Sequence, residues 1–425
     1  MRLKDLVALA PLLAMTCAIV AGVGVRASAQ RGARAATAAD DPITTMVARL
    51  DLGKYKATIE GLTQFGDRRQ GTDRNRAAID WIEAQLKSSG CTNTQRLAYV
   101  YPPPQPATAT AAQRGGGAGG RGAAPPNPSG IIPLPPTSAG GGRPRGIATR
   151  TGVNTDPGRQ PNETLRALNS QPAADGPREE VYCTKIGATR PHEMYIVGAH
   201  MDGHGWGEAA NDDGSGTALV MELARVFSSP DIQTDRSIRF ILWNNEETGL
   251  NGSRAYVEQR GKLQGKEDPP GSGRYPEPRW LGMIQHDMML FDHGMPLPDG
   301  TMSRKQRPEA DVNIEFQVSA KMAAQAQALA WILQQANEKY ATDYPAKVGS
   351  HMTNTDSTPF MDVVAAISVR ENERGTEIGS GWDPQWHQPT DVYATYTDED
   401  FRLGLNAAQT TLSAVAQLTG AKLRK

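Results

Sequence analysis

The sequence predicts an α/β fold, a single globular domain with a mixed, mainly parallel central sheet and helices on both faces. From residue 180 onward, strand-like runs alternate with helix-like runs, the order that produces parallel strands covered by helices. An earlier strand-like run at 91–100 precedes the one at 180–186, and we expect these two to pair antiparallel. That pair makes the predicted sheet mixed.

The remaining strands are expected where short apolar runs are bounded by polar or turn residues; they are 194–199, 237–244, 281–287, 312–318 and 366–370. Helices are expected where apolar residues recur at three- and four-residue spacing; they are 74–89, 215–229, 253–260, 321–340 and 399–418. In the first helix this spacing places Ile79, Ile82 and Leu86 on one face, and Gly90 ends it.

The charge balance bears on possible partners. Lys plus Arg is 45 and Asp plus Glu is 46, which gives a formal net charge of −1. A nucleic-acid binder normally carries a basic excess, so we expect no nucleic-acid partner.

The N-terminus predicts export. Arg2 and Lys4 precede an apolar run over 6–25, and Ala27-Ser28-Ala29 follows it, which is the pattern of a secretory signal peptide over 1–29. A membrane anchor is the alternative, but Pro11 and the small-residue ending favour cleavage after Ala29. The mature protein is therefore expected in the periplasm or outside the cell, with no stable membrane span.

Two segments differ in composition from the domain. Residues 30–42 are small and polar and resemble a linker, whereas residues 101–150 contain 11 Gly and 11 Pro. Such a segment cannot bury enough apolar surface to offset chain entropy, so a disordered insert is predicted over 101–178. The folded domain then comprises 43–100 and 179–425.

Cys91 and Cys183 remain after removal of the signal peptide, and both lie in the pair of strands expected to be neighbours. An exported protein can form a disulfide there. Two buried free thiols fit the sequence equally well.

Ionisable residues follow the expected strands at their carboxyl ends, where an α/β sheet gathers its functional side chains. They occur in five segments, namely His200-Met201-Asp202, Asn211-Asp212-Asp213-Gly214, Glu246-Glu247, His286-Asp287 and His387-Gln388-Pro389-Thr390-Asp391. Each segment alone is weak evidence, because such residues are common in turns. His204, His286, His293 and His351 are expected to be loop or packing residues.

Divalent cations would explain why so many carboxylates converge. Unpaired, these groups would repel one another, whereas two Zn²⁺ ions supply four positive charges against the three of Asp212, Glu247 and Asp287. Imidazole and carboxylate are ligands that suit zinc. Glu246 then remains beside the metals as a proton-transfer group, because successive side chains at a strand end diverge.

Together these segments resemble metallopeptidase family 28, the co-catalytic zinc aminopeptidases of the bacterial leucyl-aminopeptidase type, over about 41–100 and 180–425. The resemblance implies a zinc exopeptidase fold and a hydrolase that binds two zinc ions and removes residues from peptides with a free N-terminus. It further implies the following roles: His200 and Asp287 on one zinc, Glu247 and His387 on the other, Asp212 bridging, Glu246 as general base and Asp202 orienting the His200 imidazole. In the family the bond after the bridging aspartate is commonly cis, which makes Asp212–Asp213 a candidate.

Some departures and alternatives stay open. Family members often have Asn-Leu where this chain has Gln285-His286, so His286 is either a neutral substitution or a change near the metals. His351 is a weak candidate for stabilising the oxyanion. A carboxypeptidase or dipeptidase of the same fold, a glutaminyl-peptide cyclotransferase, and a noncatalytic receptor-like relative are the alternative functions.

Overall fold

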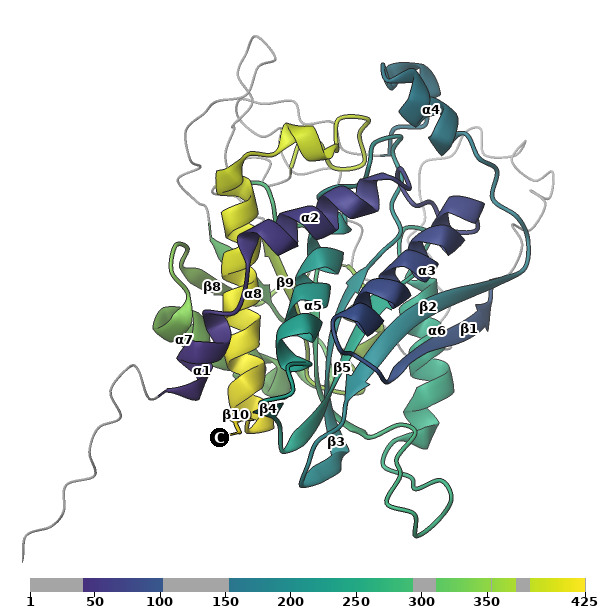
Figure 1. Cartoon of the computed structure of the whole chain (residues 1–425). Helices are drawn as coiled ribbons and strands as arrows, with labels where there is room; N and C mark the ends of the chain where they lie inside the picture. The colour runs from purple at the N-terminus through teal and green to yellow at the C-terminus, as the bar shows by residue number, and fades with distance from the viewer. Residues whose placement is uncertain (1–40, 102–152, 293–310, 353, 372–382, 425) are drawn as a thin grey trace, which may run out of the picture. The chain divides into compact units, whose positions relative to one another are not determined.

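The computed structural model describes residues 41–101, 153–292, 311–352, 354–371 and 383–424 (Figure 1). The predicted signal peptide, all but the end of the predicted linker, residues 102–152 of the predicted insert, and His293 lie outside these residues. Among the described residues, no helix combines the length and apolar character that crossing a membrane requires.

The eight-stranded sheet has the order β1-β2-β5-β3-β6-β9-β7-β8. Its strands are β1 (Thr94–Val100), β2 (Pro177–Lys185), β3 (Arg190–His200), β5 (Arg236–Trp243), β6 (Arg279–His286), β7 (Val312–Glu315), β8 (Ala346–Gly349) and β9 (Ala366–Glu371). The four strands β5, β3, β6 and β9 run parallel, while β1, β2 and β7 introduce antiparallel pairs. The sheet is therefore mixed and parallel at its centre, as predicted. A separate two-stranded ribbon joins β4 (Ile232–Gln233) to β10 (Lys422–Leu423).

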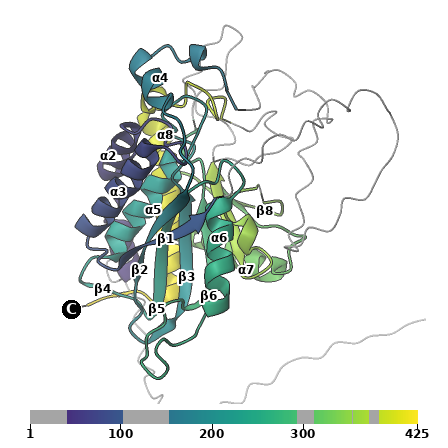
Figure 2. The ribbon, with the colours of Figure 1, turned by 90° about the vertical axis from the view of Figure 1, so that its right-hand side faces the viewer.

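Helices cover both faces of the sheet (Figure 2). They are α1 (Pro42–Val47), α2 (Leu52–Thr63), α3 (Asp73–Ser88), α4 (Glu163–Asn169), α5 (Gly214–Phe227), α6 (Asn251–Arg260), α7 (Ala323–Tyr340) and α8 (Asp398–Thr419), with short 3-10 turns at η3 (Pro157–Arg159), η4 (Gly261–Leu263), η5 (Thr358–Phe360) and η6 (Tyr393–Thr395). The larger apolar core joins one face of the sheet to α2, α3, α5, α7 and α8. A smaller core, rich in aromatic residues, joins the other face to α6 and η5.

Local chemistry explains where the helices begin. Thr72 accepts a hydrogen bond from Asn75 N and so caps α3, whose buried face includes Ile79, Ile82 and Leu86. At α8, Thr397 and Asp400 form a capping box. The sequence did not predict α2, although Tyr55, Ile59 and Leu62 on its inner face are buried.

The predicted insert over 101–178 extends too far at its C-terminal side. Residues 153–178 include η3, α4 and the start of β2, and Asn162 caps α4 by accepting from Leu165 N. The buried residues Asn154, Gln160, Leu165 and Asn169 fix this segment to the domain. The prediction of a disordered insert is therefore wrong for residues 153–178, which fold as part of the domain.

Cys91 and Cys183 form a disulfide, with their Cα atoms 6.1 Å apart. Cys91 lies just before β1, whose first residue, Thr94, is opposite Cys183 of β2. The bond closes a chain separation of 92 residues that contains the glycine- and proline-rich segment.

We predict that the double variant C91S/C183S lowers the free energy of unfolding by about 2–4 kcal/mol, because the bond restricts the unfolded chain. Urea unfolding with and without reductant measures this effect. The wild-type protein should lose stability in reductant and the double variant should not. Thr92→Ser, an exposed change beside Cys91, serves as the control. A wild-type midpoint unaffected by complete reduction would contradict the prediction.

Candidate metal centre

Three adjacent parallel strands bring the predicted site together. β3 ends at His200 and lies between β5 and β6, whose ends lead into Glu246-Glu247 and Asp287. Because the carboxyl ends of parallel strands meet at one edge of the sheet, these side chains share a region. Asp212 precedes α5, and the loop before α8 adds His387.

The five predicted ligands lie close together around Asp212. His200 Nε2 is 3.3 Å from Asp212 Oδ1 and 3.8 Å from Asp287 Oδ1. His387 Nε2 is 2.9 Å from Asp212 Oδ2 and 3.0 Å from Glu247 Oε2. The two oxygens of Asp212 therefore face different histidines, the arrangement required of a bridging carboxylate.

Buried hydrogen bonds fix the backbone on both sides of Asp212. The two oxygens of Asp391 accept from the N–H groups of Asn211, at 2.8 Å, and Asp212, at 3.1 Å. Asp213 caps α5 by accepting from Gly216 N and also accepts from His200 N. The Asp212–Asp213 peptide bond is cis, as the resemblance implies.

Asp287 is oriented by an arginine. Arg370 Nη2, from β9, lies 2.5 Å from Asp287 Oδ2, which leaves Oδ1 directed toward His200. Burial would raise the pKa of Asp287, yet the charge of Arg370 and the contact with His200 lower it to about 2. Asp287 is therefore a carboxylate at neutral pH.

Asp202 supports the site differently from the prediction. The backbone carbonyl of Asp202 accepts from His200 Nδ1 at 2.9 Å, whereas its carboxylate lies 4.0 Å from that nitrogen. A carbonyl can only accept, so the proton resides on Nδ1 and Nε2 faces Asp212. The carboxylate instead accepts from Glu246 N at 3.0 Å and so positions the candidate base.

Glu246 lies beside this cluster and is half-buried among its charged groups. Burial raises the pKa of Glu246 well above its usual value; the charge of His200 opposes this shift, while Glu247 and Asp356 add to it. A carboxylate whose pKa is raised is a stronger proton acceptor than an ordinary glutamate.

The other histidines separate into distinct groups. His286 is buried away from the cluster, with Nε2 2.9 Å from Thr411 Oγ1, and burial lowers its pKa to about 4. It is thus a packing residue, as expected, and His351 is exposed. His204 differs from the expectation, because its Nε2 lies 3.0 Å from Glu247 Oε2 and its ring contacts that of His387. The only signal for it in the sequence is the alternation His200-x-Asp202-x-His204.

Arg68 holds the loop that carries these residues and was not predicted from the sequence. It is fully buried, and its guanidinium donates to the carbonyls of Met201 at 2.7 Å, Glu208 at 2.8 Å and Ala209 at 2.8 Å. Its partners thus lie at both ends of the loop after β3. A single side chain therefore closes the loop between His200 and Asp212.

The donor set fits a divalent cation. Asp212 Oδ2, Glu247 Oε1 and His204 Nε2 are buried atoms without a hydrogen-bond partner among the described residues. Burial disfavours the charged form of His387, but the negative charges of Glu247 and Asp212 raise its pKa to about 10. Burial also opposes the charged form of His200, and its contacts with Asp212 and Asp287 raise its pKa. The carboxylates of the cluster thus stabilise positive charge on the groups beside them. Three overlapping groups of described residues each offer ligand atoms within 4.8 Å of one another: His200 with Asp212 and Glu247, His200 with Asp213 and Asp287, and His204 with Glu247 and His387.

Comparison with known proteins identifies the family. The sequence model of peptidase family M28 matches residues 181–403, more than half of the chain. The chain belongs to peptidase family M28. Its matched region contains all five candidate ligands and Glu246.

One curated relative matches part of the sequence, and two solved structures share the fold. The probable lipoprotein aminopeptidase LpqL of Mycobacterium tuberculosis is 28% identical over 239 residues, which cover 54% of this chain and 43% of that protein. The zinc aminopeptidase BSAP of Bacillus subtilis has a similar fold, with a TM-score of 0.56, 17% identity, and coverage of 87% of this chain and 95% of that chain. An aminopeptidase from Aneurinibacillus has a TM-score of 0.52 at 19% identity, covering 90% and 97%. The chain thus spans less than half of the curated relative's length.

We predict that Arg68→Lys lowers the free energy of unfolding by about 2–4 kcal/mol, because lysine cannot satisfy the same buried carbonyls. Arg69→Lys, an exposed change at the next residue, should have no measurable effect. Chemical unfolding of both variants tests the difference. Equal stability of the two variants would show that Arg68 does not hold the loop.

Proposed function

We propose that the protein is an exported aminopeptidase that uses two zinc ions to hydrolyse the N-terminal residue of peptides. The carrying observation is the position of Asp212, which has one oxygen toward His200 and the other toward His387. Membership of family M28 and similarity to the probable aminopeptidase LpqL and the zinc aminopeptidase BSAP support peptide hydrolysis and zinc. The Cys91–Cys183 disulfide supports export, because such bonds persist mainly outside the cytosol.

The proposed ligand assignment divides the site into two ends. His200 and Asp287 would hold one cation, Glu247 and His387 the other, and Asp212 would bind both. When bound, divalent cations of this kind lower the pKa of a coordinated water and polarise the substrate carbonyl. The distances of 2.9–3.8 Å between these side chains leave their donor atoms near enough to share ions.

Glu246 is the proposed general base. The Asp202 carboxylate fixes the backbone of Glu246 by accepting its N–H. If Glu247 binds metal, the carboxylate of Glu246 stays free to transfer protons. It would remove a proton from the attacking water and return it to the leaving amine. The resemblance to co-catalytic zinc aminopeptidases implies that a free α-amine of the substrate would anchor at the metal centre, and this supports cleavage after the N-terminal residue. The retention of Glu246 and of every candidate ligand argues against a receptor-like relative.

We predict that Glu246→Gln abolishes hydrolysis, with a loss of at least about 100-fold in kcat, while the variant keeps its bound metal. The amide has nearly the shape of the carboxylate but cannot accept the proton. Steady-state kinetics on aminoacyl-nitroanilides, together with metal analysis of the same sample, measure both parts. The matched control is Glu258→Gln, a change on α6 outside the cluster. Unchanged turnover of Glu246→Gln would refute the assignment of the base.

We further predict that the protein cleaves peptides with a free N-terminus, does not cleave their acetylated forms, and loses activity in chelator. Zn²⁺ added back should restore activity, because the two apolar cores and the Cys91–Cys183 disulfide include none of the candidate ligands and can hold the fold without the ions. Peptides amidated at the C-terminus should be cleaved as readily as free acids. Cleavage that requires a free C-terminus would indicate a carboxypeptidase. Pyroglutamate formation from N-terminal glutamine, without hydrolysis, would indicate a cyclotransferase.

A further inference from the structure

The ligand set expected from the sequence omits His204, which lies in the loop between β3 and α5. Its Nε2 is 3.0 Å from Glu247 Oε2, on the same oxygen that His387 approaches at 3.0 Å. The rings of His204 and His387 meet edge to face, with centroids 4.1 Å apart. Two imidazoles and one carboxylate therefore converge at this end of the site.

His204 Nε2 is buried and has no hydrogen-bond partner within the described ranges. Together with Glu247 and His387 it offers one of three ligand atoms that lie within 4.8 Å of one another. A buried nitrogen directed at a carboxylate and a second imidazole is the arrangement that a cation would satisfy.

The glycines on each side of His204 allow its loop to pack closely against the backbone of His387 and Asp212. Gly205 has a φ of +98°, and a Cβ there would lie 2.4 Å from the backbone of His387. A Cβ at Gly203 would lie 2.9 Å from the carbonyl oxygen of Asp212. Because neither position leaves room for a side chain, His204 is held close to both residues.

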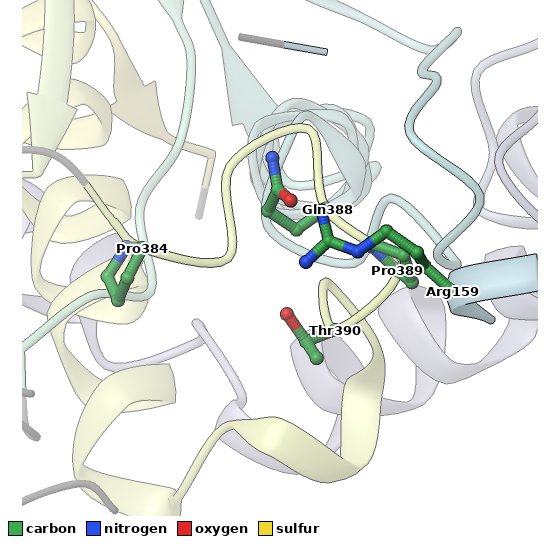
Figure 3. Close-up of a pocket in the computed structure, with 5 residues that line it drawn as sticks. All are labelled: Arg159, Pro384, Gln388, Pro389 and Thr390. Carbon is green, nitrogen blue, oxygen red and sulfur yellow. The ribbon is translucent and has the colours of Figure 1, made fainter. Parts of the chain in front are cut away.

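The segment 154–169 binds the same two loops from outside. Asn154 donates its backbone N–H to His387 O at 3.0 Å and its side chain to Gly205 O at 3.4 Å. The side-chain amide of Gln160 donates to Trp206 O at 2.7 Å and to Pro389 O at 2.9 Å. Figure 3 shows where Arg159 of this segment meets the loop after His387, at a pocket that also includes Pro384, Gln388, Pro389 and Thr390. This segment therefore fixes the positions of His204 and His387 relative to each other.

We propose that His204 is an additional protein ligand of the cation at the Glu247–His387 end. This assignment rests on the proposed two-metal function. That cation would then have His204, His387, Glu247 and the shared Asp212, a full set of four protein ligands, which is typical of a closed zinc site. The other cation would have His200, Asp287 and Asp212, three ligands, which leaves a position for solvent. The two ends would therefore differ in their number of protein ligands, and the ion held by His200, Asp287 and Asp212 would be the one with room to bind water.

The test is the binding of Zn²⁺ to the full-length protein freed of metal, measured by calorimetric titration in competition with a chelator. The wild-type protein should bind two equivalents. His204→Ala and His204→Gln should bind one equivalent with unchanged affinity and the second at least about tenfold more weakly. His192→Gln is the matched control, since His192 lies near the start of β3, about 26 Å along the strand from His200. This control should bind both equivalents as the wild type does.

A measurement on the wild-type protein tests the assignment of His204 without any substitution. X-ray absorption spectroscopy of the sample with two zinc equivalents should detect three imidazoles over the two ions rather than two. Two imidazoles, or full affinity for both equivalents in either folded His204 variant, would overturn the assignment. A His204 variant that binds both ions normally but has a raised KM would place His204 on the substrate instead. A wild-type protein that binds no zinc would refute the proposed function itself.

Discussion

The accumulation of carboxylates at one edge of the sheet is the constraint on which the rest of the site depends. Strands β5 and β6, on either side of β3, direct Glu246, Glu247 and Asp287 to the same region, and Asp212 enters it from the loop before α5. Negative charges this close together destabilise one another unless positive charge is supplied. The raised pKa values of His200 and His387 are one response to that demand, and the contact between Arg370 and Asp287 is another.

Buried polar contacts, rather than apolar packing, hold these groups in position. Arg68 joins the two ends of the loop after β3, and Asp391 holds the backbone of Asn211 and Asp212. Each contact satisfies polar groups that would otherwise be buried without a partner. Its removal would therefore lower the free energy of unfolding by more than the loss of an ordinary exposed hydrogen bond does. The site therefore depends on residues several positions away from any candidate ligand.

The sequence predicted the candidate ligands because each of them follows a strand end or belongs to a compact motif. Short apolar runs bounded by polar residues located those strands, and the family resemblance implied the role of each ligand. The sequence did not predict the roles of Arg68 and His204, because both depend on how one loop is folded. That loop includes positive φ angles at Trp206 and Ala209, which residue type does not reveal. The side chain of Asp202 was assigned to His200 for the same reason, since the turn directs its carbonyl there instead. The sequence did not predict helix α4, because the segment rich in glycine and proline was taken to continue past residue 150. Residues 163–169 contain neither glycine nor proline and form a capped helix.

The two ends of the site also differ in how their carboxylates are neutralised. Asp287 shares its charge with Arg370, which weakens its donation to any cation at the His200 end. Glu247 is approached by two imidazoles, His204 and His387, which add donor strength to the other end without adding negative charge. Under the proposed assignment, His200, Asp287 and Asp212 would hold one cation with fewer and weaker donors, which would make it the stronger Lewis acid. His204, His387, Glu247 and Asp212 would hold the other cation more firmly and would so fix the positions of Asp212 and Glu247.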